Sequence, residues 1–467
     1  MSIELKDFSE IDLQNHDLKD IAATTSLNSN KAVRQNLGMY KYYYRNSNQC
    51  KYRTGRYCGI TWLRNKDGGI REENGNKCTL QIKPRFGLNI DNMIHKIAED
   101  DEFFEYLCDD QDEGDRMFTF FFDEEMMEVS DDPLGGHLMV SISFIHLLYQ
   151  ETRRKIIRRI VHKEDNFTGK IKGRILFNKH IQKNLVQGHE ERIYCGYVEK
   201  SEDIYENRVL KYALMQARDY LMSQMIQNAQ IMREIKACEL RFSNVTNIDD
   251  VDAEEIDSIR LPVMYSNFEK LMKLAYLVVS EINMTSNLKN DANKIVPYAV
   301  NMPLLFECYC RTLVKEQIKD DPEIKMLKFV ANKSGDYDES EYGIKTIQGK
   351  YYISGKLVPD IVLKKNDKNY VFDVKYKNFS WNIKNGKAEL KHPHNPDRRD
   401  DRLQLLAYNE IFKPEFCGHI CPRVKDISVK NTSNAPILRM AKQISANKPK
   451  YYMFYLNETI DIKDLIG

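Results

Sequence analysis

Two short segments near the C-terminus place charged residues where they could carry out metal-dependent chemistry. The run Tyr370–Tyr376 is typical of a strand, on which side chains alternate, so Asp373 and Lys375 share one face. The preceding run Leu357–Leu363 is also strand-like and contains Asp360. The turn-rich sequence KKNDKN between the runs predicts a hairpin in which Asp360 lies across from Asp373.

Two carboxylates held together repel each other unless a cation neutralises them. Mg²⁺ suits such a pair because it binds through one or two carboxylates and the oxygens of a phosphate. A bound Mg²⁺ lowers the pKa of water and stabilises a leaving oxygen. We expect Lys375 to orient or help deprotonate the attacking water and to offset charge on the phosphate. A strand with a charged pair on its wet face would explain Asp373 and Lys375, but it leaves Asp360 unexplained.

The flanking segments offer further polar residues on predicted helices. Glu307 interrupts an apolar helical run, so it is either a paired core residue or a site residue facing the metal. Gln404 and Tyr408 are four residues apart and share one face of a helix predicted over 401–412, a spacing that is by itself ordinary for an amphipathic helix. Strands are predicted after this helix at 418–422 and 451–456.

The order Glu, Pro-Asp, Asp-x-Lys, Gln-x-x-x-Tyr resembles the motif set of the PD-(D/E)XK nuclease superfamily, in its RecB-like branch. The resemblance implies an α/β, restriction-endonuclease-like domain that hydrolyses DNA with Mg²⁺, for which Mn²⁺ can substitute. It implies that the metal is held by Asp360, Asp373, Val374 and Glu307. The catalytic residues that it implies are Asp360, Asp373, Lys375, Glu307, Gln404 and Tyr408.

Three further segments resemble the McrC family, the nuclease subunit of McrBC-type restriction systems. They are Leu80–Gly87 (LQIKPRFG), Lys172–Arg174 followed by Tyr205–Lys211 (YENRVLK), and Leu305–Glu307. The resemblance implies an anti-phage endonuclease subunit that cuts double-stranded DNA, modified or not, when an McrB-like AAA+ GTPase or ATPase hexamer activates it. The N-terminal half would then dock on the partner, while Asn207 and Arg208 are interpreted as structural.

The segment Gly343–Lys350 looks like a phosphate-binding loop, but its glycines are one residue too far apart and Tyr351 replaces the hydroxyl that binds Mg²⁺. We therefore expect that this chain does not hydrolyse NTP and that the partner does.

Charge is strongly separated along the 467 residues, although the formal net charge is only +1. Residues 31–64 hold eight Lys or Arg and no acidic residue, whereas residues 99–132 hold sixteen Asp or Glu and one Arg. Each stretch is either a solvated face or an interface. Ten Cys without dense spacing, and no apolar run of membrane-spanning length, predict a cytoplasmic protein without a membrane partner.

The fold class expected is α+β and multidomain. We expect a β-rich or mixed partner-docking domain over 1–165, a helical middle region over 166–290, and the PD-(D/E)XK nuclease domain over 291–467. Strands are predicted at 57–63 and 78–86, and helices at 138–161, 204–221, 268–282 and 302–318.

Three other interpretations stay open. The chain could be a stand-alone RecB-like DNA nuclease, or a non-catalytic adaptor on a nuclease fold. The segment Cys417–Cys421 (CGHIC) could suggest zinc, but the absence of a second Cys/His pair favours a buried strand.

Overall fold

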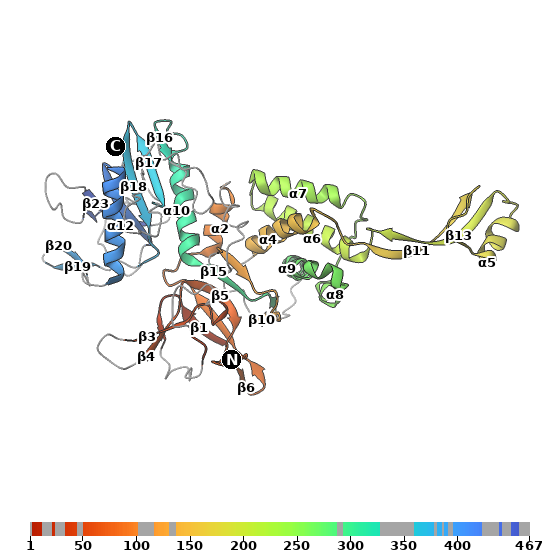
Figure 1. The fold of residues 1–467 in the computed structure, drawn as a ribbon, viewed down its shortest axis with the longest axis horizontal. Helices are drawn as coiled ribbons and strands as arrows, with labels where there is room; N and C mark the ends of the chain where they lie inside the picture. Colours follow the sequence, from red (N-terminus) through yellow and green to blue (C-terminus); the bar gives the residue numbers. More distant parts are fainter. Residues whose placement is uncertain are drawn as a thin grey trace, which may run out of the picture. The chain divides into compact units, whose positions relative to one another are not determined.

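The computed structural model describes residues 2–11, 21–23, 33–43, 50–100, 116–129, 137–286, 293–326, 359–377, 381–384, 387–390, 396–422, 439–440 and 450–456 (Figure 1). The chain forms two compact units. Unit 1 combines Met1–Phe120 with Pro297–Gly467, and unit 2 is Phe121–Val296. The expected mixture of helices and sheets is confirmed, while the three domain boundaries stay predictions. In the described part of the chain, no helix is long and apolar enough to cross a membrane.

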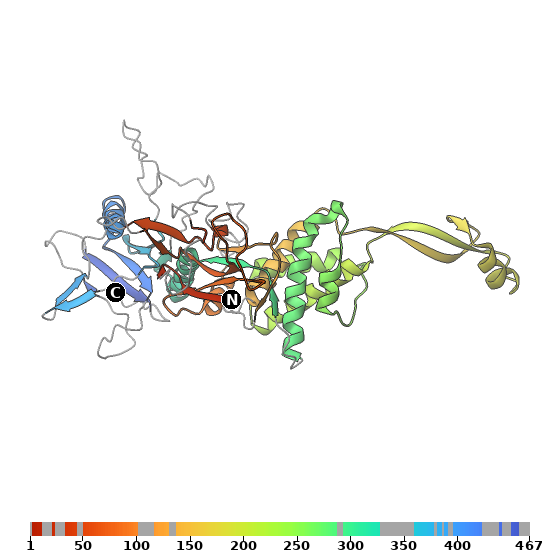
Figure 2. The same cartoon turned by 90° about the horizontal axis from the view of Figure 1, so that it is seen from below.

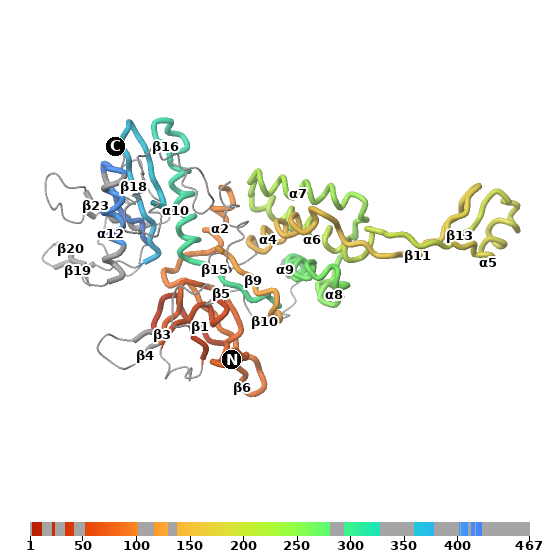
Figure 3. Tube along the Cα trace, viewed as in Figure 1, coloured from red at the N-terminus to blue at the C-terminus, as the bar shows by residue number. Residues whose placement is uncertain are grey.

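The first sheet of unit 1 has five strands in the order β1-β8-β5-β15-β9. Only β1 and β8 are parallel among these neighbours. Strand β15 comes from the C-terminal part of the chain and lies between β5 and β9 (Figure 3). A Cβ at Gly59 would lie 2.1 Å from the Tyr298 carbonyl oxygen, and its φ of +146° favours glycine, so this close approach needs Gly59. The strands are β1 Ser2–Lys6, β8 Thr79–Lys83, β5 Tyr57–Trp62, β15 Tyr298–Asn301 and β9 Phe118–Phe120.

Smaller elements complete the N-terminal part of unit 1. Helix α2 starts at the Asn89 side chain, which accepts a hydrogen bond from the Asn92 amide. Ion pairs between Lys96 and Glu316 (2.5 Å) and between Asp100 and Lys315 (2.9 Å) join this region to helix α10, Met302–Ile318. The elements are β2 Glu10–Ile11, β3 Tyr40–Tyr43, β4 Cys50–Arg53, β6 Glu72–Glu73, β7 Asn76–Lys77 and α2 Ile90–Ala98.

The second large sheet of unit 1 has the order β16-β17-β18-β21-β23-β22. The β17–β18 hairpin turns at Asn366 and Asp367, whose φ angles of 48° and 62° suit a tight two-residue turn. Strands β18, β21 and β23 run parallel, and the strand order places β18 and β21 inside the sheet. The strands are β16 Ile324–Met326, β17 Ile361–Lys365, β18 Lys368–Val374, β21 Phe416–Pro422, β22 Arg439–Met440 and β23 Lys450–Leu456, beside a separate pair β19 Trp381–Lys384 and β20 Lys387–Leu390.

Two helices pack on this sheet. Helix α10, Met302–Ile318, begins at the Asn301 cap and contacts β16 and β18, while α12, Pro396–Phe412, contacts β18 and β21 (Figure 1). Apolar side chains from the strands and α12 form one buried cluster, which fixes α12 against β18. Its members are Val362, Val371, Leu405, Tyr408, Phe412 and Cys417.

Unit 2 is built mainly from helices. The prediction of helices at 204–221 and 268–282 is confirmed, and the helix predicted at 138–161 ends earlier, at Thr152. The elements are β10 Met127–Val129, α4 His137–Thr152, α6 Tyr205–Ser223, α7 Ala229–Arg241, α8 Ala253–Ser258, the 3₁₀ helix η3 Val263–Phe268, α9 Glu269–Ser286 and β14 Asn293–Ile295.

A long β-ribbon projects from the helices of unit 2, and we call it the finger, residues 159–201 (Figures 1 and 2). It corrects the expectation of helices through the first part of the middle region, because ten residue pairs of β11 and β13 form one antiparallel ladder. At its tip lie a short helix and a π-helix. The elements are β11 Arg159–Thr168, β12 Arg174–Ile175, α5 Phe177–His180, η2 Ile181–Leu185 and β13 Arg192–Ser201.

Several expectations lie outside the described residues. They concern Gly343–Lys350, the segment that looks like a phosphate-binding loop, and residues 101–115 of the acidic stretch 99–132.

Candidate active site

Asp360 and Asp373 meet across the β17–β18 hairpin. The register pairs Ile361 with Phe372, so Asp360 comes next opposite Asp373, as the sequence predicts. Asp360 Oδ2 accepts a hydrogen bond from the Val374 amide at 2.6 Å. Asp373 is fully buried, because α12 covers this part of the sheet. A water-facing charged strand pair therefore does not describe Asp373.

Lys375 brings a positive charge to these carboxylates. Its Nζ lies 2.6 Å from Asp373 Oδ2, and it donates a hydrogen bond to Gln404 Oε1 at 3.1 Å. Gln404 Nε2 in turn donates to the Tyr408 hydroxyl at 2.7 Å. A lysine ammonium has no acceptor, so the Gln404 oxygen must face Lys375 and its nitrogen must face Tyr408. Helix α12 thus holds the Lys375 ammonium through Gln404.

The three acidic residues of the site influence one another. Burial raises the pKa of the Asp360 carboxyl, and the charges of Glu307 and Asp373 raise it further. Burial also raises the pKa values of Glu307 and Asp373, against the opposing effects of Arg311 on Glu307 and of Lys375 on Asp373. For the Lys375 ammonium, burial lowers the pKa, but the carboxylates of Asp373 and Asp360 outweigh burial and raise it. The two cationic groups Lys375 and Arg311 act on three carboxyl groups, so the site favours an additional cation or protons.

The chemistry of these residues fits a hard divalent cation. Asp373 Oδ1 is buried and accepts no hydrogen bond from the described residues. In that part of the chain, no three Asp, Glu, His or Cys side chains form a ready-made metal cage. Mg²⁺ seldom needs one, since it keeps several waters and binds substrate phosphate. Asp360, Asp373 and the Val374 carbonyl could hold it, with Glu307 nearby on α10.

His419 is a polar neighbour of the site. The sequence predicts only that this residue lies in a buried strand. That strand, β21, is confirmed, and the parallel register pairs His419 with Asp373. His419 Nε2 lies 3.7 Å from Asp373 Oδ2, and burial lowers the pKa of His419 to about 3, so the imidazole is neutral. The sequence signal for His419 is a histidine between two cysteines in an apolar strand. Short-range patterns do not show which strand β21 pairs with. Cys417 and Cys421 are buried free thiols.

A second ion pair stands beside the site. Lys377 Nζ lies 2.9 Å from both carboxylate oxygens of Asp401 on α12, and Asp401 is 6% exposed. The pair ties the chain just after Lys375 to α12. Of the residues that the sequence singled out, the structure thus brings together Asp360, Asp373, Val374, Lys375, Gln404 and Tyr408, and it places Glu307 within electrostatic reach of them.

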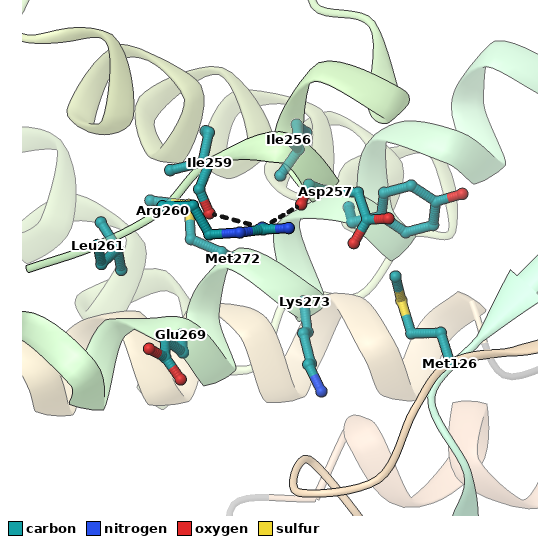
Figure 4. A pocket seen from close by; sticks show the side chains of 10 residues that line it. Met126, Ile256, Asp257, Ile259, Arg260, Leu261, Glu269, Met272 and Lys273 are labelled. Atoms are coloured by element: carbon teal, nitrogen blue, oxygen red, sulfur yellow. Dashed lines mark hydrogen bonds between the residues drawn. The ribbon is translucent and has the colours of Figure 1, made fainter.

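Unit 2 contains a pocket of about 270 Å³ (Figure 4). Its charged side chains serve the fold, since Lys273 donates to the carbonyls of Phe122 and Glu124 and Arg260 donates to those of Asp257 and Ile259. The pocket therefore offers no catalytic set comparable to the one in unit 1.

The family described as McrBC 5-methylcytosine restriction system component matches residues 63–417, which is more than half of the chain. The chain belongs to this family. The match ends at β21, so it includes Asp360, Asp373, Lys375 and both α12 residues.

Two solved structures are similar to the McrBC-family chain. One is the refined half-complex from the tetradecameric assembly of Thermococcus gammatolerans McrB AAA+ hexamers with bound McrC, at 15% identity and a TM-score of 0.35, covering 98% of this chain and 94% of that one. The other is the Thermococcus gammatolerans McrBC complex, at 15% identity and a TM-score of 0.29, covering 71% and 89%. No curated protein matches the chain.

The mid-chain segments that resemble McrC have structural roles in this McrBC-family chain. A Cβ at Gly173 would lie 2.6 Å from the Gly196 carbonyl oxygen, and its φ of +73° also favours glycine. Gly173 therefore lets the chain approach β13 closely just before β12 pairs with it. Asn207 donates to the carbonyls of Ile157 and Glu202, at 2.7 Å each. Arg208 pairs with Asp203. These contacts agree with the interpretation of Asn207 and Arg208 as structural, which stays a prediction.

Proposed function

We propose that this chain is the Mg²⁺-dependent DNA endonuclease subunit of an McrBC-type restriction system, the counterpart of McrC. The domain that holds the site would then be of the PD-(D/E)XK, restriction-endonuclease-like type. The observation that carries the proposal is the group formed by the buried Asp373 with the half-buried Asp360 and Lys375, in which one ammonium faces an excess of carboxyl groups. Membership of the McrBC 5-methylcytosine restriction family supports DNA as the substrate.

Each side chain has a defined task in this proposal. Mg²⁺, when bound, supplies an activated water and stabilises the leaving oxygen of the phosphodiester. Asp360, Asp373 and the Val374 carbonyl would hold it, and Glu307 would add negative charge on the α10 side. The Lys375 ammonium donates to the oxygens of the scissile phosphate and keeps the attacking water in line. Gln404 and Tyr408 fix the direction of Lys375 by the two hydrogen bonds described above.

The finger is the surface we propose for docking on an McrB-like AAA+ hexamer. Its tip exposes the apolar side chains of Phe177 (68%) and Val186 (76%), with Ile181 and Leu185 between them. Apolar groups gathered on an exposed projection favour burial against a partner. Hydrogen bonds also hold the tip together, since the buried Asn184 side chain donates to Asn166 Oδ1 and to the Arg192 carbonyl. The partner would supply DNA recognition, translocation and NTP hydrolysis.

The test is cleavage of DNA by the full-length chain combined with its AAA+ partner. Duplex DNA with and without 5-methylcytosine is incubated with Mg²⁺ and GTP or ATP. We expect Asp360→Ala, Asp373→Asn and Lys375→Ala each to abolish cleavage while assembly and NTP hydrolysis persist. Asp367→Asn is the matched control, because it removes the same charge from the exposed turn of the same hairpin.

The outcomes separate this proposal from the two alternatives. Near-normal cutting by any of the three site variants would show that the assigned site is wrong. Cleavage that needs no partner would identify a stand-alone nuclease. A complex that hydrolyses NTP and binds DNA but never cuts it, at any Mg²⁺ or Mn²⁺ concentration, would identify an adaptor.

A further inference from the structure

We propose that Arg85 is a positioning residue that couples the N-terminal sheet of unit 1 to Lys375, the residue directly after β18. The inference rests on the proposed nuclease function, and it gives a task to the segment Leu80–Gly87, which the site itself does not use. Arg85 lies two residues after β8 and touches the residue that directly follows Lys375.

The contact is made by the main chain of Tyr376. Arg85 Nη2 donates a hydrogen bond of 2.8 Å to the Tyr376 carbonyl oxygen across 291 residues of sequence. The guanidinium also stands over the Tyr376 ring, 5.4 Å from its centroid. A planar guanidinium can stack on a ring and donate in its own plane, which a lysine cannot do in the same way.

Aromatic rings enclose the guanidinium on further sides. Its Cζ lies 4.6 Å from the centroid of Phe8 and 4.5 Å from that of Phe86. The Tyr376 ring packs edge-on against Phe86 at 5.0 Å and contacts Phe306 of α10 at 5.7 Å. Residues from the N-terminal sheet region and from α10, the helix that carries Glu307, therefore meet around Tyr376.

The carboxylate of Asp7 completes this cluster. Asp7 is fully buried and its Oδ1 accepts a hydrogen bond from the Arg85 amide at 2.7 Å. Asp7 directly follows β1, so both parallel strands β1 and β8 end at the cluster. This hydrogen bond ties the main chain of Arg85 to the end of β1, and breaking it is costly because it would leave a buried polar group unsatisfied.

The junction fixes the backbone that aims Lys375. The Lys375 amide donates to the Ile420 carbonyl at 2.8 Å, and the Lys377 amide donates to the Lys375 carbonyl at 2.7 Å. Arg85 then holds the peptide group between Tyr376 and Lys377. With these three hydrogen bonds in place, a shift of the N-terminal sheet is transmitted to the Lys375 side chain, which must reach both Asp373 and Gln404. The coupling acts through Arg85 because it joins the two main-chain segments directly.

The experiment compares Arg85→Met and Arg85→Lys with a matched control, Arg71→Met, whose ion pair is with Glu73 in the same N-terminal region. The full-length chain assembled with its AAA+ partner is assayed for single-turnover cleavage and DNA affinity on 5-methylcytosine duplex DNA. The full-length chain alone is assayed for thermal unfolding and for amide hydrogen exchange of residues 370–377.

We expect Arg85→Met to slow single-turnover cleavage by about ten- to a hundredfold with DNA affinity unchanged, because a small misplacement of a catalytic group has effects of this size. Amide exchange should accelerate in residues 370–377 but not in α6. Arg85→Lys, which keeps a donor and the charge, should recover part of the rate. Arg71→Met should cleave like the unmodified chain.

The inference fails if Arg85→Met, folded, cleaves within about twofold of the unmodified chain. It also fails if the loss lies in DNA affinity, or if exchange rises equally in α6. Should Arg85→Met not fold, Arg85→Lys is judged by the same criteria. An unmodified complex that does not cleave would overturn the proposed function instead, and the exchange measurement would still decide whether Arg85 holds residues 370–377.

Discussion

Burial distinguishes two aspartates of unit 1 from ordinary surface aspartates. Asp373 and Asp7 are both fully buried, yet they lie in different clusters, one facing Lys375 and the other facing Arg85. Lys375 forms an ion pair with Asp373, whereas the charge of Arg85 acts on the Asp7 carboxylate, whose hydrogen bond comes from the Arg85 backbone amide. At the residue scale, the stability and the activity of this chain should therefore depend on a few buried charges.

Asp7 gives a pH dependence of stability with a defined sign. Burial raises the pKa of Asp7 from 3.8 to about 6, so the folded chain takes up a proton more readily than the unfolded chain. This contribution to stability is complete below about pH 3.8 and is lost as the pH rises through 6. The shift corresponds to roughly 3 kcal/mol. Urea unfolding at pH 4 and pH 7.5 should show that the Asp7→Asn chain gains stability relative to the unmodified chain at the higher pH.

The control for this measurement is Asp67→Asn, which removes the same charge from an exposed turn. A pH-independent difference between Asp7→Asn and the unmodified chain would contradict the expected role of Asp7.

Tyr408 provides a second test at the residue scale. Tyr408→Phe removes the acceptor of the Gln404 Nε2–H bond, so Gln404 can turn away from Lys375. We expect a loss of about 1 kcal/mol in the free energy of unfolding and a slower Mg²⁺-dependent cleavage step, measured by single-turnover kinetics. Tyr370→Phe, which removes a buried tyrosine hydroxyl from β18, should leave the cleavage rate closer to normal. Equal rates for the two variants would show that the Tyr408–Gln404 hydrogen bond does not position Lys375.

At the scale of elements, the finger differs from the rest of the described chain in how little of its own surface is buried. Most residues of β11 and β13 are exposed or half-buried, and ion pairs such as Lys172 with Glu199 (3.1 Å) run across the ribbon. Exposed ion pairs of this kind contribute little to stability. The ten-residue ladder and the glycine at 173 keep its shape, so the finger can present its tip without a core of its own.

The double variant Phe177→Ser with Val186→Ser tests the tip. We expect it to raise the Kd for the AAA+ partner by tenfold or more, which corresponds to about 1.4 kcal/mol or more of binding free energy. Size-exclusion chromatography and a binding titration measure this change. Thermal unfolding of the chain alone should barely change, because both side chains are already exposed. The matched control Leu240→Ser with Val263→Ser changes equally exposed residues of the helical part and should assemble normally. Normal assembly of the tip variant would rule out the tip as the docking surface.

At the scale of the whole molecule, the two compact units carry different tasks in our proposal. The site residues all belong to unit 1, and the finger belongs to unit 2. A cation bound at the site should therefore stabilise unit 1 and leave unit 2 unaffected, since a ligand stabilises only the structure that forms its site.

Hydrogen exchange with and without Mg²⁺ measures this difference. At a Mg²⁺ concentration one hundred times its Kd, we expect the free energy of opening measured by exchange to rise by about 2.7 kcal/mol in unit 1. In unit 2 this free energy should not change. The gain should increase with pH, because the raised pKa values of Asp360 and Asp373 mean that protons compete with the metal. Asp373→Asn should abolish the gain and Asp367→Asn should keep it. Equal protection of both units would place the metal elsewhere.

Short-range patterns in the sequence were enough to predict the hairpin and its residues. The alternation around Asp373, the turn sequence after Leu363 and the spacing of Gln404 and Tyr408 all reflect backbone geometry over a few residues. For the same reason the long helices of unit 2 could be predicted from their apolar spacing. The sequence likewise indicated the resemblance to McrC, and the family match agrees with it.

Only the tertiary structure decided which distant segments meet. It placed β15 in the N-terminal sheet, His419 beside Asp373, and Arg85 on the Tyr376 carbonyl. It also revealed the finger, whose strands are too polar and too exposed to show the alternation of a half-buried sheet. Local periodicity records how a segment repeats along its own backbone, whereas these contacts depend on which surfaces pack together.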